Sequence, residues 1–524
     1  MLLIALAAAA SVQDRGRIID RDRIDRPPVV VTPEKPKQPP RAKIDIAPPR
    51  ASVPIKGIRF IGADAPAPVA KAARRFLGKP TTTATLQDLA AALSSAYEKS
   101  DVALYTVAIP DQDFAEGVVV VSLTEGRIAN ATVAAKGRFP LLAARLAPLT
   151  KEAPLSRATF ERQFLLMRAI PGLTIEPAFD DPANTGALSL TIKPKQKRHK
   201  FSLGFSNRGV DLLGQGQFDA SAEFYRALVD GDQLRIEGSA ASDLRRYRYA
   251  GASYALPIGA GGLTVSASGG YFETRPRGIA LTGRAKVAGI AITYPLLRAF
   301  KRSSDISLGI DGIDSDNAVL GNLVASERTR AVRLAASYSD TRTRRAVSIS
   351  GSVSKGLDLG GARVTAPFAE AGFFKVAGTV SAAQQIGKRG YIRITATGQY
   401  SRDRLPAAER YSLGGDSIGR AFPTSILTGD RGLGGVVELA WRPVKAGPFG
   451  QSEMYGFVDG GVLAVLPRGP MPRIDSSLAS AGLGLRARYR DKVELGLEAA
   501  RSLKAPAAGQ DDDWRLSVEW RLSL

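Results

Sequence analysis

The sequence predicts a transmembrane β-barrel of about 16 antiparallel strands, preceded by two small α+β modules. Two observations lead to this prediction. From residue 201 onward, segments of about ten residues alternate apolar and polar side chains, with glycine, asparagine, aspartate, proline or arginine between them. Between residues 55 and 198 the chain instead shows helical periodicity between short strands, and this order occurs twice.

The predicted barrel covers residues 199–524, and its last segment shows the alternation most clearly. One face carries Trp514, Leu516, Val518, Trp520, Leu522 and Leu524, and the other carries Arg515, Ser517, Glu519, Arg521 and Ser523. A soluble antiparallel sheet gives the same alternation, but the number of segments and an export signal favour a membrane barrel. At roughly 20 residues per strand and connection, this region holds about 16 strands, an even number as in bacterial barrels.

The N-terminal segment has the composition of an export signal followed by a linker. Residues 1–10 form an apolar run that ends in small residues, which is typical of a secretory signal peptide. No Lys or Arg precedes the run, so we expect a truncated signal; a frayed apolar N-terminus is the alternative. Residues 11–54 begin with alternating charges, as in a solvated tail or short helix, and become rich in proline, which predicts an extended linker.

Two modules with the same order of elements follow the linker. The first, residues 55–126, is predicted as a strand, two helices and two strands, with Thr85 as the N-cap of the second helix. The second, residues 127–198, repeats this order and has Ser156 as the N-cap of its second helix.

Composition excludes several classes of site. The net charge of +22 suits nucleic acid, anionic lipid or an acidic partner. The basic residues are scattered along alternating strands, so we expect no nucleic-acid partner. The chain has no cysteine and one histidine, His199, which leaves no thiolate nucleophile and no two-histidine metal motif. With no phosphate-binding loop or nucleophile elbow, we expect no catalytic, cofactor or metal site, and therefore no enzyme.

One long loop interrupts the predicted barrel at residues 411–435. It is rich in glycine, contains Arg420 and includes the run Gly429-Asp430-Arg431-Gly432. A loop of this length inside an ordered region is usually either functional or disordered. Its aromatic and aliphatic residues argue against disorder, so we expect a functional role.

Three stretches resemble the two-partner secretion transporters of the haemolysin secretion/activation type. They are Pro154-Leu155-Ser156 with the helix-to-strand segment from Arg168 to Ile175, the segment from Leu405 to Gly415 at the start of the long loop, and Phe457-Val458-Asp459-Gly460-Gly461. The resemblance implies that the two modules are POTRA domains in the periplasm. It also places the long loop between barrel strands 11 and 12.

The resemblance further implies which residues of the loop and the barrel act together. Arg420 of the loop would pair with Asp459 on the inner wall, as a planar guanidinium bound to a carboxylate. The loop motif would comprise Gly414, Gly415, Ile418, Gly419, Phe422, Gly429, Asp430 and Gly432, and the strand motif Phe457, Gly460 and Gly461. The family usually has Val-Arg-Gly before an aromatic residue, whereas this chain has Ile418-Gly419-Arg420-Ala421-Phe422.

By resemblance, the protein exports an unfolded secreted partner across the bacterial outer membrane without nucleotide. The partner would be encoded by an adjacent gene and would bind the periplasmic modules, while outer-membrane lipid would surround the barrel. One alternative is an assembly factor of the same superfamily, although those proteins usually carry more POTRA modules. A solute-passing porin is the other, but a porin does not need residues 55–195.

Overall fold

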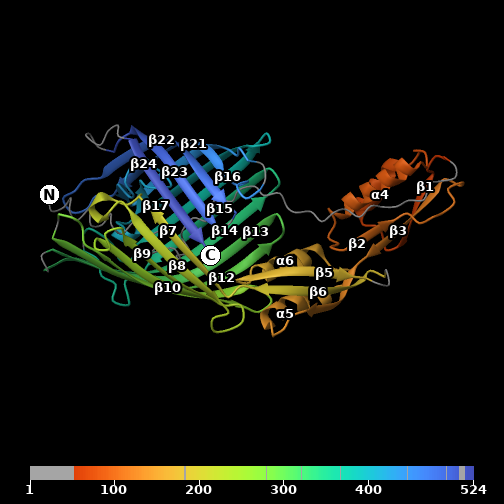
Figure 1. Ribbon diagram of the computed structural model, residues 1–524, viewed down its shortest axis with the longest axis horizontal. Coiled ribbons are helices and arrows are strands. Elements are labelled where there is room, and N and C mark those ends of the chain that lie inside the picture. Colours follow the sequence, from red (N-terminus) through yellow and green to blue (C-terminus); the bar gives the residue numbers. More distant parts are fainter. Residues whose placement is uncertain are drawn as a thin grey trace.

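The computed structural model describes residues 52–181, 185–278, 280–319, 322–365, 367–444, 447–490, 492–506 and 514–524. Residues 1–10, the expected signal peptide, and nearly all of the expected linker lie outside these ranges. Figure 1 shows a closed barrel with two small modules extending from one of its ends.

The first module is a three-stranded sheet covered by helices on one face. Its elements are β1 (Gly57–Gly62), α3 (Ala67–Ala73), the 3-10 helix η2 (Arg74–Phe76), α4 (Thr83–Tyr97), β2 (Tyr105–Ala108) and β3 (Val118–Glu125). The strand order is β1-β3-β2, with β1 parallel and β2 antiparallel to β3. Leu86, Leu89 and Leu93 of α4 are fully buried against the sheet, which follows from their helical spacing.

The second module has the same topology, as the recurring sequence pattern predicts. It contains β4 (Arg127–Val133), α5 (Pro140–Leu146), η3 (Ala147–Thr150), α6 (Arg157–Arg168), β5 (Leu173–Asp180) and β6 (Ala187–Gln196). The strand order is β4-β6-β5, again with one parallel and one antiparallel pair.

Of the two predicted helix N-caps, one is confirmed and one is wrong. The Ser156 hydroxyl accepts a hydrogen bond from the Thr159 N–H at 3.2 Å, which confirms Ser156 as the N-cap of α6. The predicted cap Thr85 is wrong, because α4 begins one turn earlier. Its N-cap is Thr82, whose hydroxyl accepts from the Thr85 N–H at 3.2 Å. Several consecutive threonines can each supply a capping oxygen, so the sequence alone did not fix the position.

Sixteen antiparallel strands close the barrel, as predicted. They are β7 (His199–Ser206), β8 (Gln217–Tyr225), β9 (Gln233–Ala241), β10 (Tyr247–Ile258), β11 (Leu263–Thr274), β12 (Leu281–Arg298), β13 (Arg302–Val319), β14 (Asn322–Thr341), β15 (Arg345–Gly356), β16 (Phe374–Ile386), β17 (Gly390–Ser401), β20 (Arg431–Trp441), β21 (Glu453–Val465), β22 (Ile474–Tyr489), β23 (Val493–Lys504) and β24 (Trp514–Ser523). The last strand pairs with the first, β24 with β7, so that the sheet has no free edge.

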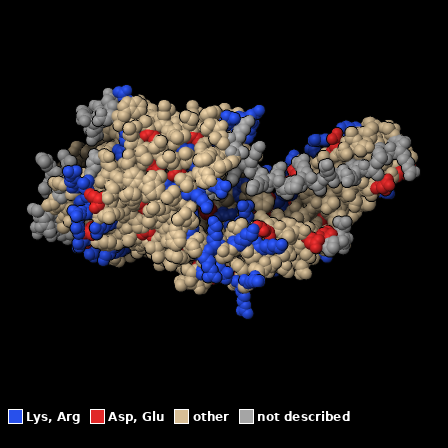
Figure 2. All heavy atoms as spheres, viewed as in Figure 1, with Lys and Arg blue, Asp and Glu red and all other residues tan. Residues whose placement is uncertain are grey.

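Side chains alternate between the two faces of the barrel wall. On β24, Trp514 and Leu516 are exposed on the outer face, while Ser517 is buried. Figure 2 shows Lys and Arg gathered toward the two ends of the barrel, with mainly uncharged residues between them on the visible face. An apolar outer band between charged rims suits a barrel that crosses a bilayer. Among the described residues, no helix is both long and apolar enough to span a membrane.

The second module contacts the barrel at the turns that join its strands. Arg162 of α6 donates hydrogen bonds to the carbonyls of Gly261 and Pro295, both at 3.0 Å. The Phe300 N–H donates to the Glu161 carboxylate at 3.0 Å, and the Leu141 N–H to the Asp230 carboxylate at 2.9 Å. Both modules lie at one end of the barrel (Figure 1).

Candidate functional site: the inner loop and its contacts

Residues 402–430 form the inner loop, which joins β17 to β20 and folds back against the inner wall. Two three-residue strands, β18 (Tyr411–Leu413) and β19 (Leu427–Gly429), pair antiparallel and give the loop a hairpin core. This hairpin lies against β20 and β21. The loop is therefore an ordered element of the barrel interior.

The boundaries of the loop differ from the predicted 411–435. The loop begins at residue 402, nine residues earlier, and ends at 430, because residues 431–435 already belong to β20. The glycines at 432, 434 and 435 made this segment look like a turn, since glycine normally weakens a strand. Here all three stay in the strand, and Gly432 and Gly434 leave room for the loop.

Glycines on the inner wall let the loop approach closely. A methyl group added at Gly432 would lie 2.3 Å from a ring carbon of Tyr411, and one at Gly461 would lie 2.7 Å from a methyl carbon of Leu413. Gly434 faces the ring hydroxyl of Tyr411 and the end of Ile418 in the same way, at about 3 Å. An apolar cluster fills this contact, consisting of Tyr411, Leu413, Ile418, Phe422, Leu463 and Leu478.

Arg420 lies beyond this cluster, at the tip of the loop, and three carboxylates surround it. One of its terminal nitrogens, Nη1, donates to Glu438 of β20 and to Glu498 of β23, both at 3.2 Å. Its guanidinium carbon lies 4.4 Å from the centre of the Phe457 ring, which is a cation–π distance. We call Arg420, Glu438, Asp459 and Glu498 the Arg420 cluster; every side chain in it is at least nine-tenths buried.

Asp459 contacts Arg420, but not through the bidentate pair that the sequence led us to expect. The Nε atom of Arg420 lies 4.0 Å from the nearer carboxylate oxygen of Asp459, which is beyond hydrogen-bond reach. The carboxylate instead accepts the backbone N–H groups of Gly419 at 2.9 Å and Arg420 at 3.2 Å, and the Ser480 hydroxyl at 2.6 Å. Asp459 thus holds the backbone of the loop tip, and the two glutamates hold the guanidinium.

Further arginines neutralise the carboxylates of this cluster. Glu438 accepts hydrogen bonds from Arg393 at 2.7 Å and from Arg486 at 2.8 and 2.9 Å. Glu498 accepts from Arg208 at 2.8 Å and from the hydroxyl of Tyr455 at 2.7 Å. Arg420 is therefore one of several cations that share these carboxylates, and the glutamates stay paired on the barrel wall without it.

A second ionic cluster holds the start of the loop on another part of the wall, formed by β13, β14 and β16. Glu409 accepts two hydrogen bonds from the guanidinium of Arg333 on β14, at 2.7 and 3.1 Å. Lys375 of β16 lies 2.7 Å from the same carboxylate, and Asp311 of β13 binds the other side of Arg333. We call Asp311, Arg333, Lys375 and Glu409 the Glu409 cluster. The side chains of Arg333 and Glu409 have no exposed surface.

The family model described as haemolysin secretion/activation protein ShlB/FhaC/HecB matches residues 186–487, more than half of the chain. The chain belongs to this family. A second model, the ShlB-type POTRA domain, matches residues 53–126. The family consists of outer-membrane transporters of two-partner secretion, so this barrel lies in the outer membrane with its POTRA modules in the periplasm. No curated protein matches the chain by sequence.

Solved structures share this fold at low sequence identity. CdiB from Escherichia coli superposes with a TM-score of 0.72 at 18% identity, covering 98% of both chains. CdiB from Acinetobacter baumannii gives 0.64 at 18% identity over 99% of both chains. BamA from Haemophilus ducreyi, in a form lacking POTRA domains 1–3, gives 0.55 at 14% identity, covering 91% of this chain and all of that one.

The departure of this transporter from the usual loop order has a local geometric reason. Gly419, which stands where the family motif has no glycine, has φ = +80°, and its N–H donates to Asp459. A methyl group there would lie 2.8 Å from Leu478 and 3.1 Å from the backbone of Gly414. Gly414 and Gly415 also have positive φ, at 105° and 109°. Residue 419 therefore needs glycine, and the arginine follows it.

Asp430 and Gly429 close the end of the loop onto its start. The Asp430 carboxylate accepts the backbone N–H of Leu405 at 2.8 Å and that of Leu466 at 2.7 Å, and it forms an ion pair with Arg468. A methyl group at Gly429 would lie 2.7 Å from the carbonyl oxygen of Ala464. These residues form a second site, at the base of the loop, and do not contact the Arg420 cluster.

The strand motif on β21 is divided between the two faces of the wall. Phe457, Asp459 and Gly461 point inward to the loop, whereas Gly460 lies on the outer face between the exposed Val458 and Val462. Gly460 thus has no contact with the loop. A methyl group there would meet the backbone of Leu478 and Ala479 on the neighbouring strand at 3.0–3.4 Å.

Sequence reasoning missed three residues that hold the loop. Glu409 was part of a recognised stretch without an assigned role, and Glu438 and Glu498 were not singled out. A signal was available for the last two, because both glutamates occupy inward positions between outward apolar residues such as Val437, Leu439 and Leu497. A carboxylate at an inward position of a strand is a candidate partner for a loop arginine.

Proposed function

We propose that the POTRA modules bind an unfolded secreted partner protein and that the barrel passes it outward without nucleotide. The observation that carries this proposal is the inner loop, which buried ion pairs hold inside the barrel. Folding of the partner outside the cell would supply the direction of transport. Such a partner is expected to be encoded by an adjacent gene.

The modules offer strand edges suited to an extended chain. Their sheet orders, β1-β3-β2 and β4-β6-β5, leave each outer strand with one neighbour inside its own sheet. An unfolded segment can add to such an edge through backbone hydrogen bonds, with little dependence on its sequence. The second module is the better candidate for handover, because α6 is attached to the barrel turns through Arg162 and Glu161.

Transport would require the tip of the inner loop to move. The tip and its apolar cluster lie against the inner wall formed by β20–β23, where a passing chain would need space. The contacts of Arg420 at 3.2 Å are ionic and can be replaced by water as the barrel opens. Glu438 and Glu498 keep other arginines as partners, so release of the tip does not leave these two carboxylates unpaired.

Binding to the partner's N-terminal fragment tests the proposal. The full chain should retain the N-terminal fragment of the neighbouring secreted protein, and a variant lacking residues 55–195 should insert as a barrel but retain none of it. Equal retention by the two proteins would refute the role of the modules. If the full chain instead retained unfolded outer-membrane barrels and not the fragment, an assembly factor would be the better assignment.

A porin is the remaining alternative, and a conductance measurement separates it from a transporter. A plain porin would conduct small ions steadily with the loop in place. We expect the wild-type barrel to be mostly closed in a planar bilayer, because the loop and its clusters occupy the inner wall.

A further inference from the structure

Three neighbouring turns at the periplasmic end form a strongly basic stretch, which we call the basic rim. It consists of residues 301–302, 342–345 and 388–389, which contain seven Lys or Arg and no Asp or Glu. Backbone hydrogen bonds join these turns to one another. The Thr341 N–H donates to the Lys301 carbonyl at 2.7 Å, and the Gln385 N–H to the Arg344 carbonyl at 2.7 Å. The rim is therefore one continuous surface.

Carboxylates neutralise little of this charge. Asp340 binds Arg342 through two hydrogen bonds of 2.9 Å. Within the part of the chain that the structure describes, neither Lys388 nor Arg389 has a carboxylate within ion-pair distance. Six of the seven cations are exposed, and Arg389 is half-buried. Nothing in the export mechanism above uses these charges.

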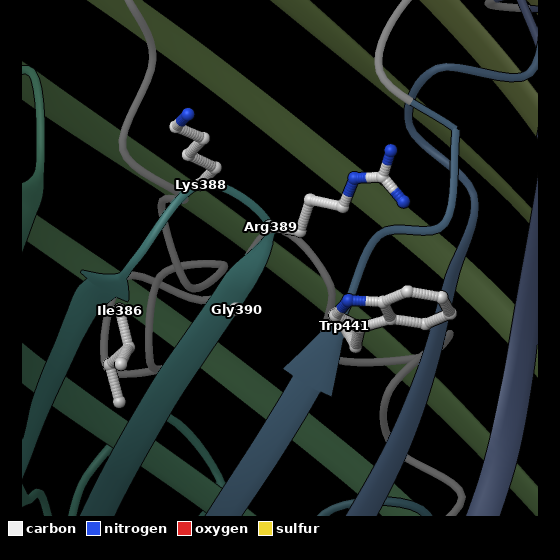
Figure 3. Close-up of a pocket in the computed structure, with 5 residues that line it drawn as sticks. All are labelled: Ile386, Lys388, Arg389, Gly390 and Trp441. Atoms are coloured by element: carbon white, nitrogen blue, oxygen red, sulfur yellow. The ribbon is translucent and has the colours of Figure 1, made fainter.

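The rim lies directly beneath the surface that faces lipid. Ile386 and Trp441 are 53% and 47% exposed on the outer face of the barrel, at the ends of β16 and β20. Together with Lys388, Arg389 and Gly390 they line a shallow pocket, in which the Arg389 guanidinium lies 5.9 Å from the Trp441 ring (Figure 3). The pocket thus joins two cations to two apolar side chains, on the outside of the barrel.

The position of the rim along the chain fixes which leaflet it meets. Its first turn follows Phe300, whose ring packs edge-on against Phe160 and Phe164 of the second POTRA module. The rim therefore lies at the periplasmic end of the barrel, on the side of the inner leaflet of the outer membrane. Trp441 sits where aromatic residues commonly mark a membrane–water interface.

We propose that the basic rim binds the phosphate headgroup of anionic phospholipids in the periplasmic leaflet, with Lys388, Arg389 and Trp441 as its best-defined site. Lys and Arg bind the phosphate, while Ile386 and Trp441 contact the upper acyl chain. The outward position of Ile386 and Trp441 favours lipid over an acidic segment of the secreted partner, which would approach through the modules or the lumen. It also favours lipid over free phosphate, which gains nothing from an apolar wall.

Quenching of Trp441 by brominated lipid tests this site. The chain has three tryptophans, so Trp514→Phe and Trp520→Phe leave Trp441 as the single reporter. This protein is placed in phosphatidylcholine bilayers that contain brominated phosphatidylglycerol or, for comparison, brominated phosphatidylcholine. We expect phosphatidylglycerol to be enriched around Trp441 by roughly two- to fivefold, as for cations at a charged membrane surface. Lys388→Gln with Arg389→Gln should reduce the enrichment to about one.

A matched control changes charge at the other end of the barrel. Arg275→Gln with Arg277→Gln removes two exposed cations from the loop after β11 and should leave the enrichment unchanged. Equal loss in both double variants, or no enrichment in the wild type, would overturn the proposal. A comparison of two buffers of equal ionic strength gives another contradicting result. If the wild type lost its phosphatidylglycerol enrichment in inorganic phosphate but kept it in chloride, the site would bind free phosphate. If the Lys388→Gln and Arg389→Gln variant kept its enrichment but bound the partner's N-terminal fragment more weakly, the rim would be a binding surface for the secreted partner.

Discussion

The start and the tip of the inner loop are held by ionic clusters of different construction. At the start, the Glu409 carboxylate lies between Arg333 and Lys375 and has no exposed surface. At the tip, Arg420 contacts Glu438 and Glu498 at 3.2 Å and shares both with other arginines. The start thus depends on one central carboxylate, whereas the tip can leave while Glu438 and Glu498 keep their other arginine partners. The difference suggests a fixed start and a releasable tip.

The largest effect on transport is expected at the tip. Arg420→Ala should reduce secretion of the partner by roughly tenfold or more. A loss of about 1.4 kcal/mol in the binding of the tip to the wall already lowers the population of the correctly placed loop tenfold relative to the displaced loop. The variant should still reach the outer membrane, since Glu438 and Glu498 keep Arg393, Arg486 and Arg208 as partners. Secreted partner in the culture medium and the amount of transporter in outer-membrane fractions give the two readouts.

Arg402→Ala is the matched control for this variant. Arg402 belongs to the same loop but is exposed, and its side chain donates to the hydroxyl of Tyr400. It should secrete like the wild type. Normal secretion by the Arg420 variant would refute the role assigned to the tip.

At the start, the main effect is expected on stability. Glu409→Gln leaves the cations of Arg333 and Lys375 buried without their shared carboxylate, and breaking a buried pair in this way costs about 3–5 kcal/mol. The temperature at which the barrel unfolds on a heat-modifiability gel should fall clearly below that of Arg420→Ala. An equal fall in the two variants would remove the distinction between the ends.

A smaller effect is expected where the loop packs on the glycine wall. Gly432→Ala places a methyl group against the ring of Tyr411, and overpacking of this kind costs about 1–3 kcal/mol. We expect the loop to shift and the barrel to conduct more ions in a planar bilayer. Gly269→Ala is the control, because its nearest neighbour would be a carbonyl oxygen at 3.7 Å. Equal conductance in the two variants would show that the wall does not position the loop.

The fold was predictable because periodicity is a local signal. The alternation from Trp514 to Leu524 and the helical spacing of Leu86, Leu89 and Leu93 each report which face of an element is buried. The site was predictable only in part, through the resemblance that picked out Arg420 and Asp459. The two residues do form an ion pair, at 4.0 Å, but the expected bidentate geometry was wrong because Asp459 binds the loop backbone, and this depends on the positive φ of Gly419.

The Glu409 cluster shows what the sequence could not reveal. Its members come from β13, β14, β16 and the loop, and they are brought together by the closure of the barrel. No local pattern marks Glu409 as buried, since it follows two alanines in a 3-10 turn, η5 (Ala407–Glu409), that looks solvated. Gly432 and Gly434 led to the wrong loop boundary, because they look like turn residues although a strand that packs against a loop needs small residues.

Reversible disulfide cross-links at the tip and at the start of the loop test the account most directly. The chain has no native cysteine, so the introduced cysteines can pair only with each other. The tip pair is Ala421→Cys with Ser480→Cys, where the Ala421 N–H lies 3.4 Å from the Ser480 hydroxyl. The start pair is Glu370→Cys with Arg404→Cys, where the Glu370 N–H donates to the Arg404 carbonyl at 2.8 Å. We predict that the oxidised tip pair stops secretion and that reduction restores it, while the start pair secretes in both states. Secretion through the oxidised tip pair would contradict the proposal that the tip must move.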